Sequence, residues 1–284
     1  MKSPRGSVLI LSLWTLTLLT SLTVTQAGTV GAAWRLTERM QDTLDALDLA
    51  QQGLTQALTT LDADSTRAWD APSEPWGHRQ EQTTPAGAWT ILVTDDAGLL
   101  NVNTCSRETL ARLPESSPAL ASAIIDQRTQ HPFHHAAELA LLSGMTPERL
   151  RSWAPLMTVV GKGPVNLNSV STEVLEVLGV PASAAATIVA WRNGPDGQLG
   201  TADDHVFHDV ADIAPVSSAL LKPDEAVTLM NLVNTGQLGV RSNAYRIIAQ
   251  GRSIGRSQTR RTCVALVERQ APGLPSTIRG WHEA

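Results

Sequence analysis

The feature that most constrains this chain is an uncharged apolar run close to its N-terminus. Lys2 and Arg5 come before Gly6, and the next charged residue is Arg35. Residues 7–25 are all Leu, Val, Ile, Trp, Thr or Ser. A helix needs about 20 predominantly apolar residues to cross a bilayer, so the run predicts a transmembrane helix at residues 7–27. Because both leading charges are basic, we expect residues 1–6 to stay in the cytoplasm and the chain beyond Arg35 to lie outside.

Three interpretations of this segment are open. It could be a secretory signal that is cleaved after Thr25-Gln26-Ala27, since a basic start, an apolar centre and small residues are typical of such signals. It could be a plain membrane anchor. It could also be a leader of the pilin type, a short basic peptide that is cut between Gly6 and Ser7 while the apolar helix stays in the mature protein.

The residues beyond the membrane favour the pilin-type leader. Apolar residues continue there as a stripe with helical spacing, separated by polar residues. The stripe consists of Met40, Leu44, Leu47, Leu54, Leu58 and Leu61. A cleaved signal gives no reason for the helix to continue, whereas a pilin-type helix carries a globular head on its outer half. We therefore expect one helix that extends through residues 28–62, with the stripe packing against helices of partner subunits.

The net charge of the chain limits its possible partners. The formal net charge is −5, and loss of the leader with Lys2 and Arg5 would leave −7. A surface of this sign does not attract nucleic acid through its net field.

Cys105 and Cys263 could form a disulfide in an oxidising compartment, or they could be two small buried residues. The internal repeat described below favours the second, because Val170 takes the place equivalent to Cys105.

The outer part of the chain predicts a head that is divided by an insertion. Residues 62–87 resemble a linker, and strand patterns follow at 88–94 and 99–103. Strand patterns return only at 244–249 and 262–267, after a long helical region. We therefore expect a small antiparallel sheet formed by residues 63–104 and 233–284, with a helical insertion at 105–232. The predicted class is α+β: a long N-terminal helix packed on a small sheet, with a large all-α insertion.

The insertion contains an internal repeat. The matching segments are 101–104 with 166–169, 123–128 with 187–192, and 133–134 with 207–208. Each copy predicts a helix capped by Thr or Ser, a tight turn, and a second helix that ends near an Arg. The pattern resembles the helix-hairpin-helix units of DNA-binding competence proteins and repair enzymes. In those families a Gly-hydrophobic-Gly turn binds phosphate, but Glu115 and Pro181 stand in the turns of this chain, so we expect the repeats to be packing modules.

The second copy contains an additional loop, residues 193–206, that suggests metal chemistry. Glycines let its backbone curl, and Asp196, Thr201, Asp203 and Asp204 supply hard oxygen atoms. Ca²⁺ prefers six to eight such oxygens in flexible geometry, so we predict Ca²⁺ as the cofactor of this loop. The alternative is a surface loop that uses Asp and Gly for its turns. No nucleophile elbow or phosphate-binding loop is present, and we expect no enzymatic activity.

The order of these parts resembles the K family of minor pseudopilins, the general secretion pathway protein K of bacterial type II secretion. The resemblance rests on the leader, the paired Asn-x-Asn-Thr/Ser units and the Gly-Thr-Ala-Asp-Asp loop. It implies a calcium-binding head in the periplasm, an inner-membrane anchor, cleavage by prepilin peptidase, and a tip complex with I- and J-type minor pseudopilins above the major pseudopilin. Leu11 stands where major pilins carry a Glu at the fifth mature position, which fits a subunit with no neighbour above it. The rival interpretation is a membrane-anchored DNA-binding protein of an uptake system.

Overall fold

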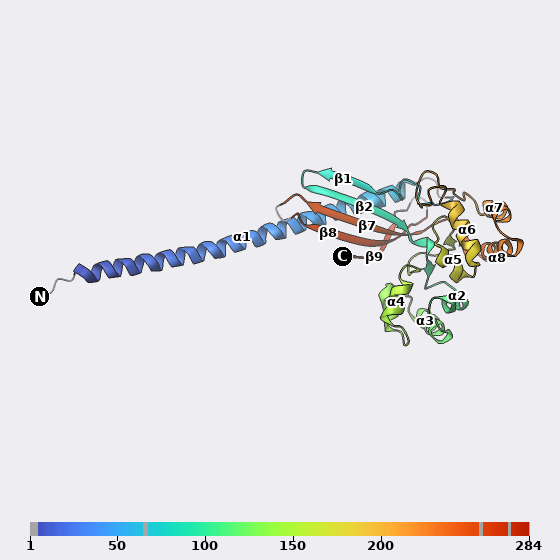
Figure 1. Cartoon of the computed structure of the whole chain (residues 1–284), viewed down its shortest axis with the longest axis horizontal. Coiled ribbons are helices and arrows are strands. Elements are labelled where there is room, and N and C mark those ends of the chain that lie inside the picture. The colour runs from blue at the N-terminus through green and yellow to red at the C-terminus, as the bar shows by residue number, and fades with distance from the viewer. Residues whose placement is uncertain (1–4, 65–67, 256–257, 272–273, 284) are drawn as a thin grey trace.

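The N-terminal helix α1 is the longest element of the protein. The computed structural model describes residues 5–64, 68–255, 258–271 and 274–283. Helix α1 runs over Arg5–Ala63 and contains 59 residues, which corresponds to about 90 Å at about 1.5 Å per residue. Its first half projects alone, and its second half lies against the head (Figure 1). The expectation of one continuous helix is confirmed for the described residues.

The head is a five-stranded antiparallel sheet with α1 packed on one face. The strands are β1 (Gln80–Thr84), β2 (Gly87–Asp95), β7 (Ala244–Ser253), β8 (Arg260–Glu268) and β9 (Thr277–Glu283), in the order β1-β2-β7-β8-β9. Helix α1 crosses β2, β7 and β8. Side chains of β7 alternate, so that Tyr245, Ile247 and Ala249 are buried beneath the helix. Gly251 permits the close approach, because a Cβ there would collide with the carbonyl oxygen of Ala46.

The α+β class is confirmed, but the strand assignment from sequence was incomplete. Residues 62–87 are not only a linker, since they contain β1. The predicted strand at 99–103 is wrong as a part of the head: only Leu100–Asn101 (β3) is extended, and it pairs with Met157–Thr158 (β4) outside the main sheet. The sequence pattern also missed β9. These strands are polar or exposed and therefore lack the alternation that marks a half-buried strand.

The insertion consists of two modules with the same order of elements. Module 1, residues 100–158, contains β3, α2 (Arg107–Arg112), α3 (Pro118–Gln130), a 3-10 turn (Ala136–Leu141), α4 (Pro147–Trp153) and β4. Module 2, residues 165–239, contains β5 (Val165–Asn166), α5 (Thr172–Leu178), α6 (Ala182–Arg192), a 3-10 turn (Val210–Asp212), α7 (Ile213–Leu220), α8 (Pro223–Asn234) and β6 (Leu238–Gly239). In each module the first and last strands pair in parallel. The insertion is thus helical apart from these two short strand pairs, which lie partly outside the predicted bounds of 105–232.

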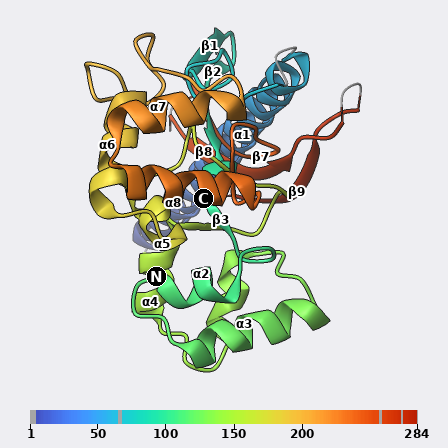
Figure 2. The ribbon, with the colours of Figure 1, turned by 90° about the vertical axis from the view of Figure 1, so that its right-hand side faces the viewer.

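The predicted repeat is confirmed at the level of local structure. Ser106 and Ser171 cap α2 and α5 through their side chains, as the Ser/Thr pattern indicated. The modules lie next to each other, with α2–α4 on one side and α5–α8 on the other (Figure 2), and α2 contacts α5. They share one hydrophobic core, to which Leu110 and Trp153 contribute from module 1 and Leu175 contributes from module 2.

Candidate functional site

The first half of α1 has the composition of a membrane anchor. Among the described residues, one helix is long and apolar enough to span a bilayer, and its best 18-residue window has a mean hydropathy of 1.9 with none of it buried. Its large side chains from Val8 to Leu36 are exposed. Met1–Pro4 of the predicted leader lie outside the described residues, and the backbone of Gly6 and Ser7 is in the first turn of α1. Cleavage between Gly6 and Ser7 stays a prediction.

The second half of α1 has two different apolar faces. Small residues and one leucine, Ala46, Leu49, Ala50 and Ala57, are buried on the sheet. The predicted stripe lies on one flank of this face: Met40 and Leu44 are 60% and 59% exposed, and Leu47, Leu54 and Leu58 are half-buried. The prediction of partner-helix packing is wrong for Leu61, because this residue is fully buried in the core of this chain and is not available to a partner helix.

Each module is closed by an asparagine that binds a distant backbone segment. In module 2, Asn168 Oδ1 accepts a hydrogen bond from Phe207 N at 2.9 Å, and Asn168 Nδ2 donates to Phe207 O at 2.9 Å. In module 1, Asn103 makes the same pair of bonds with Phe133, both at 2.9 Å. Satisfying buried backbone groups in this way stabilises the connection after each hairpin. The Asn-x-Asn signal of the sequence therefore marks a structural clamp.

An arginine at the end of each second helix completes the closure. Arg192 donates to Leu167 O at 3.1 Å and Val170 O at 2.6 Å, and Arg128 donates to Val102 O and Cys105 O. Arg192 is 3% exposed. Its burial lowers the pKa of the guanidinium to about 10, and this shift is opposed by the nearby Asp204 carboxylate.

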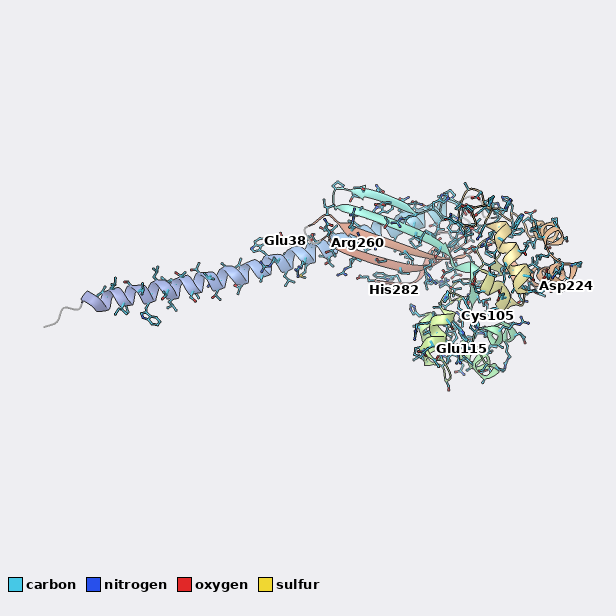
Figure 3. The ribbon with its side chains drawn as sticks, in the orientation of Figure 1. Glu38, Cys105, Glu115, Asp224, Arg260 and His282 are labelled. Carbon is cyan, nitrogen blue, oxygen red and sulfur yellow. The ribbon has the colours of Figure 1, made fainter. Side chains whose placement is uncertain are left out.

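The turns between the hairpin helices are not arranged to bind phosphate. Helix α6 begins after Pro181, which has no N–H to offer. A carboxylate from α8 already lies at this helix end: Glu225 Oε1 accepts a hydrogen bond from Ser183 Oγ at 2.7 Å. The Ser183 hydroxyl, followed by the Lys222 backbone N–H, lowers the pKa of Glu225 and keeps it ionised. Glu115, in the other turn, is exposed and lies in module 1 between α2 and α3 (Figure 3). Both turns thus present a negative charge where a phosphate would have to bind.

The structure brings the side chains of three predicted calcium ligands, Thr201, Asp203 and Asp204, into contact, whereas the carboxylate of Asp196 accepts a hydrogen bond from Gln198 N. Thr201 Oγ1 donates to Asp203 Oδ1 at 2.8 Å and lies 3.3 Å from Asp204 Oδ1. The backbone N–H of Asp196 donates to Asp203 Oδ2 at 3.2 Å. The Thr201 hydroxyl, followed by this N–H, lowers the pKa of the Asp203 carboxyl. Gly194, Gly197 and Gly200 have positive φ and curl the loop around these groups.

The chemistry of this donor set fits Ca²⁺. Three carboxylates and one hydroxyl are hard oxygen ligands, and the loop that carries them is exposed and bends at three glycines. Asp196, Thr201, Asp203 and Asp204 would hold the ion, which would supply the positive charge that neutralises their carboxylates. The loop is anchored at its two ends by Arg192 and by the clamp on Phe207.

A second acidic cluster lies where α1 ends and was not predicted from the sequence. Asp64, Asp70 and Glu74 form the one set of three carboxylates, within the described part of the chain, whose oxygens all lie within 4.8 Å of one another. Arg269 donates to Asp64 at 2.7 Å and also to Asp70, while Tyr245 donates to Asp70 at 2.8 Å. Burial, aided by the charges of Asp64 and Asp70, raises the pKa of Glu74 to about 7. Asp70 and Arg269 are too far apart in sequence for any local pattern to join them.

The head is joined to module 2 by a buried aspartate. Asp95 Oδ2 accepts hydrogen bonds from Asn166 Nδ2 at 2.8 Å, Ser169 Oγ at 2.5 Å and Ser242 Oγ at 2.5 Å. Burial raises the pKa of Asp95 to about 6, and these three donors act against that shift. The first asparagine of the Asn-x-Asn unit in module 2 therefore connects the insertion to the sheet.

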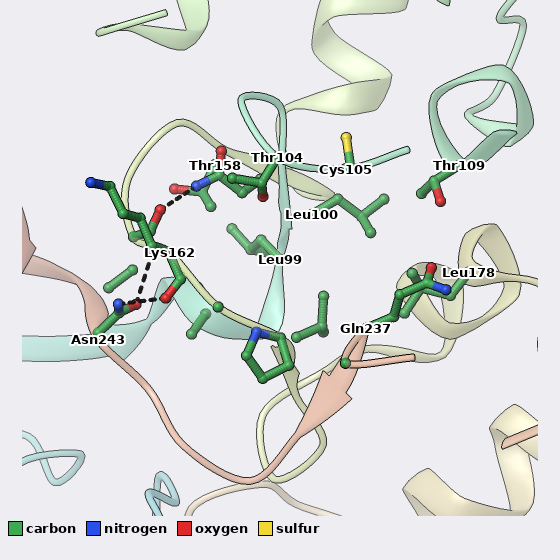
Figure 4. A pocket seen from close by; sticks show the side chains of 18 of the residues that line it. Leu99, Leu100, Thr104, Cys105, Thr109, Thr158, Lys162, Leu178, Gln237 and Asn243 are labelled. Atoms are coloured by element: carbon green, nitrogen blue, oxygen red, sulfur yellow. Dashed lines mark hydrogen bonds between the residues drawn. The ribbon is translucent and has the colours of Figure 1, made fainter. Parts of the chain in front are cut away.

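A cavity of about 410 Å³ lies between the two modules (Figure 4). Its wall includes Leu100, Cys105, Lys162 and Gln237. Lys162 is held at the rim by Asn243, which donates to Lys162 O at 2.7 Å. The lining mixes apolar and neutral polar groups with the cationic side chain of Lys162.

The possible disulfide is not formed. Cys105 and Cys263 are both free. Cys263 is fully buried in β8 opposite Ala249, and Cys105 follows the Asn clamp of module 1. Burial raises the pKa of the Cys105 thiol to about 11. Cys263 is therefore a small buried side chain, whereas Cys105 is half-buried and lines the cavity between the modules.

Comparisons with known proteins agree with this architecture. Residues 95–158 match the family model described as "Helix-hairpin-helix motif", which coincides with module 1. No curated protein sequence matches the chain significantly. A chain of the crystal structure of the GspK-GspI-GspJ complex from the enterotoxigenic Escherichia coli type 2 secretion system is similar in fold, with a TM-score of 0.66 and 15% identity over 87% of this chain and 99% of that chain. The chain thus has a pseudopilin-like fold.

Proposed function

We propose that this chain is a K-type minor pseudopilin of a type II secretion system. It is anchored in the inner membrane by α1, carries its head in the periplasm, and forms a tip complex with I- and J-type minor pseudopilins above the major pseudopilin. The observation that carries this proposal is the similarity in fold to a chain of the GspK-GspI-GspJ complex, which extends over 87% of the sequence and includes the insertion. We propose no enzymatic activity.

The position of the insertion supports a role at the tip. Modules 1 and 2 lie at the end of the molecule opposite the N-terminus (Figure 1). In a filament whose subunits align their N-terminal helices, a domain of this width would obstruct the next subunit above. Leu11 supports the same role, because a carboxylate at that position is costly in hydrocarbon unless a neighbour pairs with it. A subunit that initiates and caps the pseudopilus needs no such pairing.

Two measurements test the proposal. N-terminal sequencing of the chain purified from membranes should begin at Ser7 after cleavage by prepilin peptidase, whereas a start at Gly28 would indicate a cleaved secretory signal. Gold-labelled copies should then decorate only one end of the pseudopilus. Labels distributed along the shaft would refute the capping role, and a matched label on the major pseudopilin provides the control.

We further propose that Ca²⁺ binds the loop 193–206 through Asp196, Thr201, Asp203 and Asp204. The contacts of the Thr201 hydroxyl with the carboxylates of Asp203 and Asp204 support this assignment.

The second candidate function is DNA binding in an uptake system, which the helix-hairpin-helix match at residues 95–158 favours. The carboxylate of Glu225 at the start of α6 and the acidic net charge oppose it.

A further inference from the structure

Strand β9 presents apolar side chains on the face of the sheet that α1 covers elsewhere. Residues directly opposite each other in an antiparallel pair point to the same face. Trp281 lies opposite Ala265, and Ile278 lies opposite Val267. Ala265 and Val267 are fully buried beneath α1. Trp281 and Ile278 nevertheless remain 54% and 39% exposed, because the extensive contacts of α1 are with β2, β7 and β8.

The leucine flank of α1 faces the same side as β9. Asp62, near the end of α1, accepts hydrogen bonds from Ser276 N at 3.0 Å and Ser276 Oγ at 2.7 Å. Ser276 immediately precedes β9, and Leu58 lies one turn before Asp62 on the same side of the helix. Leu54 and Leu58 are half-buried against the core of the head. An apolar strip is therefore formed by Leu47, Leu54 and Leu58 of α1 together with Ile278 and Trp281 of β9.

The dimensions of the sheet favour a helix as the occupant of this strip. Helix α1 is centred on β7, and β9 lies two strands away, which is about 10 Å at the usual strand spacing. Helices that pack side by side have axes about 8–10 Å apart, so a helix alongside α1 would lie over β9. On the opposite side β1 is also two strands from β7, but its residues Gln80–Thr84 are all polar. Of the two edge strands that the structure describes, β9 is the one that offers apolar side chains to such a helix.

The strip is continuous with the membrane-spanning surface of α1. Leu44 and Met40 extend it downward and are 59% and 60% exposed. A helix that fills the strip and continues along this flank therefore enters the bilayer beside α1. We propose that the strip is the docking site for the N-terminal helix of a second membrane-anchored subunit, an I- or J-type minor pseudopilin, held between α1 and β9 rather than by α1 alone. This inference rests on the proposed function and specifies the face at which the subunits meet.

Photo-crosslinking in membranes tests the docking site. The full chain is co-expressed with the I- and J-type minor pseudopilins of the same organism, with p-benzoylphenylalanine at position 281 or 54. Matched controls carry it at His282, which lies opposite Val264 and faces away from α1, and at the exposed Gln52. Positions 281 and 54 should both crosslink to the N-terminal helix of the same partner, and the two control positions should not.

A pair of substitutions provides the quantitative test. W281D should weaken co-purification of the complex at least about tenfold, because exposed Trp residues at interfaces are common hot spots, while H282D should leave it unchanged. Far-UV circular dichroism of both variants checks the fold. A complex that forms but crosslinks equally from positions 282 and 52, and withstands W281D, would overturn the docking site and leave the proposed function intact. Failure of the unmodified chain to bind either pseudopilin would overturn both.

Discussion

The asparagine clamps allow a direct comparison between two copies of one structural unit. In module 2, Asn168 is 1% exposed. Its side chain makes three hydrogen bonds to buried backbone groups, at 2.9 Å to Phe207 N, 2.9 Å to Phe207 O and 3.1 Å to Asp70 O. We predict that N168A destabilises module 2 by about 3–5 kcal/mol, since each lost bond contributes about 1 kcal/mol and each orphaned buried group adds a further cost.

The equivalent change in module 1 should be milder. Asn103 binds Phe133 N and O at 2.9 Å each, and Val159 O at 3.1 Å, but it is only half-buried. Water can replace part of its hydrogen bonding after N103A, so we expect a loss of about 1–2 kcal/mol. The two variants delete the same atoms from the same motif, and the difference between them measures the effect of burial.

Amide hydrogen exchange on the full chain measures both effects at their sites. The Phe207 amide should exchange about 10² to 4 × 10³ times faster in N168A, since about 1.4 kcal/mol corresponds to a factor of ten. The Phe133 amide should accelerate by about 5-fold to 30-fold in N103A, and each variant should leave the other amide unchanged. Equal effects of the two substitutions, or a loss below about 1 kcal/mol in N168A, would refute the reasoning.

Three further predictions follow from the charged groups. Millimolar Ca²⁺ should raise the melting temperature of the chain, and D203A with D204A should abolish the shift, whereas D209A outside the loop should retain it. Burial raises the pKa of Glu74 to about 7 and that of Asp95 to about 6. The stability that their protonation supplies is therefore complete below about pH 4 and is lost as the pH rises to 6 and 7. E74Q should flatten the unfolding free energy between about pH 5 and 7, and an unchanged slope there would contradict this. Duplex DNA should show no salt-sensitive shift at low ionic strength, and strong binding that weakens with salt would support the uptake interpretation.

Sequence reasoning recovered the features that depend on local patterns. The apolar run before Arg35 and the duplicated Asn-x-Asn units predicted α1 and the two modules, because helical periodicity and internal repetition are visible within short windows. It missed β1 and β9, where the residues are polar or exposed. It also missed the acidic cluster that binds Arg269, since Asp70 and Arg269 meet only after the sheet has formed.

The face of α1 that packs on the sheet was not identified from the sequence, for a different physical reason. A stripe of leucines is the ordinary signal of a buried helix face, but the sheet packs on Ala46, Ala50 and Ala57 beside that stripe. Small residues let the helix and the strands approach closely, as the collision of a Cβ at Gly251 with Ala46 demonstrates. Such residues carry little hydrophobicity, so a sequence pattern gives them little weight.

Module 1 matches the helix-hairpin-helix motif and module 2 has the same order of elements, but their turns differ chemically from a phosphate-binding turn. Phosphate binding requires exposed backbone N–H groups at the start of the second helix, and the Glu225 carboxylate already lies at the start of α6. The Arg192 guanidinium would attract phosphate as a free cation. It instead donates hydrogen bonds to the carbonyl oxygens of Leu167 and Val170 inside the module. These two groups are therefore bound within the protein, and the two modules share one hydrophobic core at the end of a long helix. Under the proposed capping role, this shared core would hold the width of the insertion against a growing fibre.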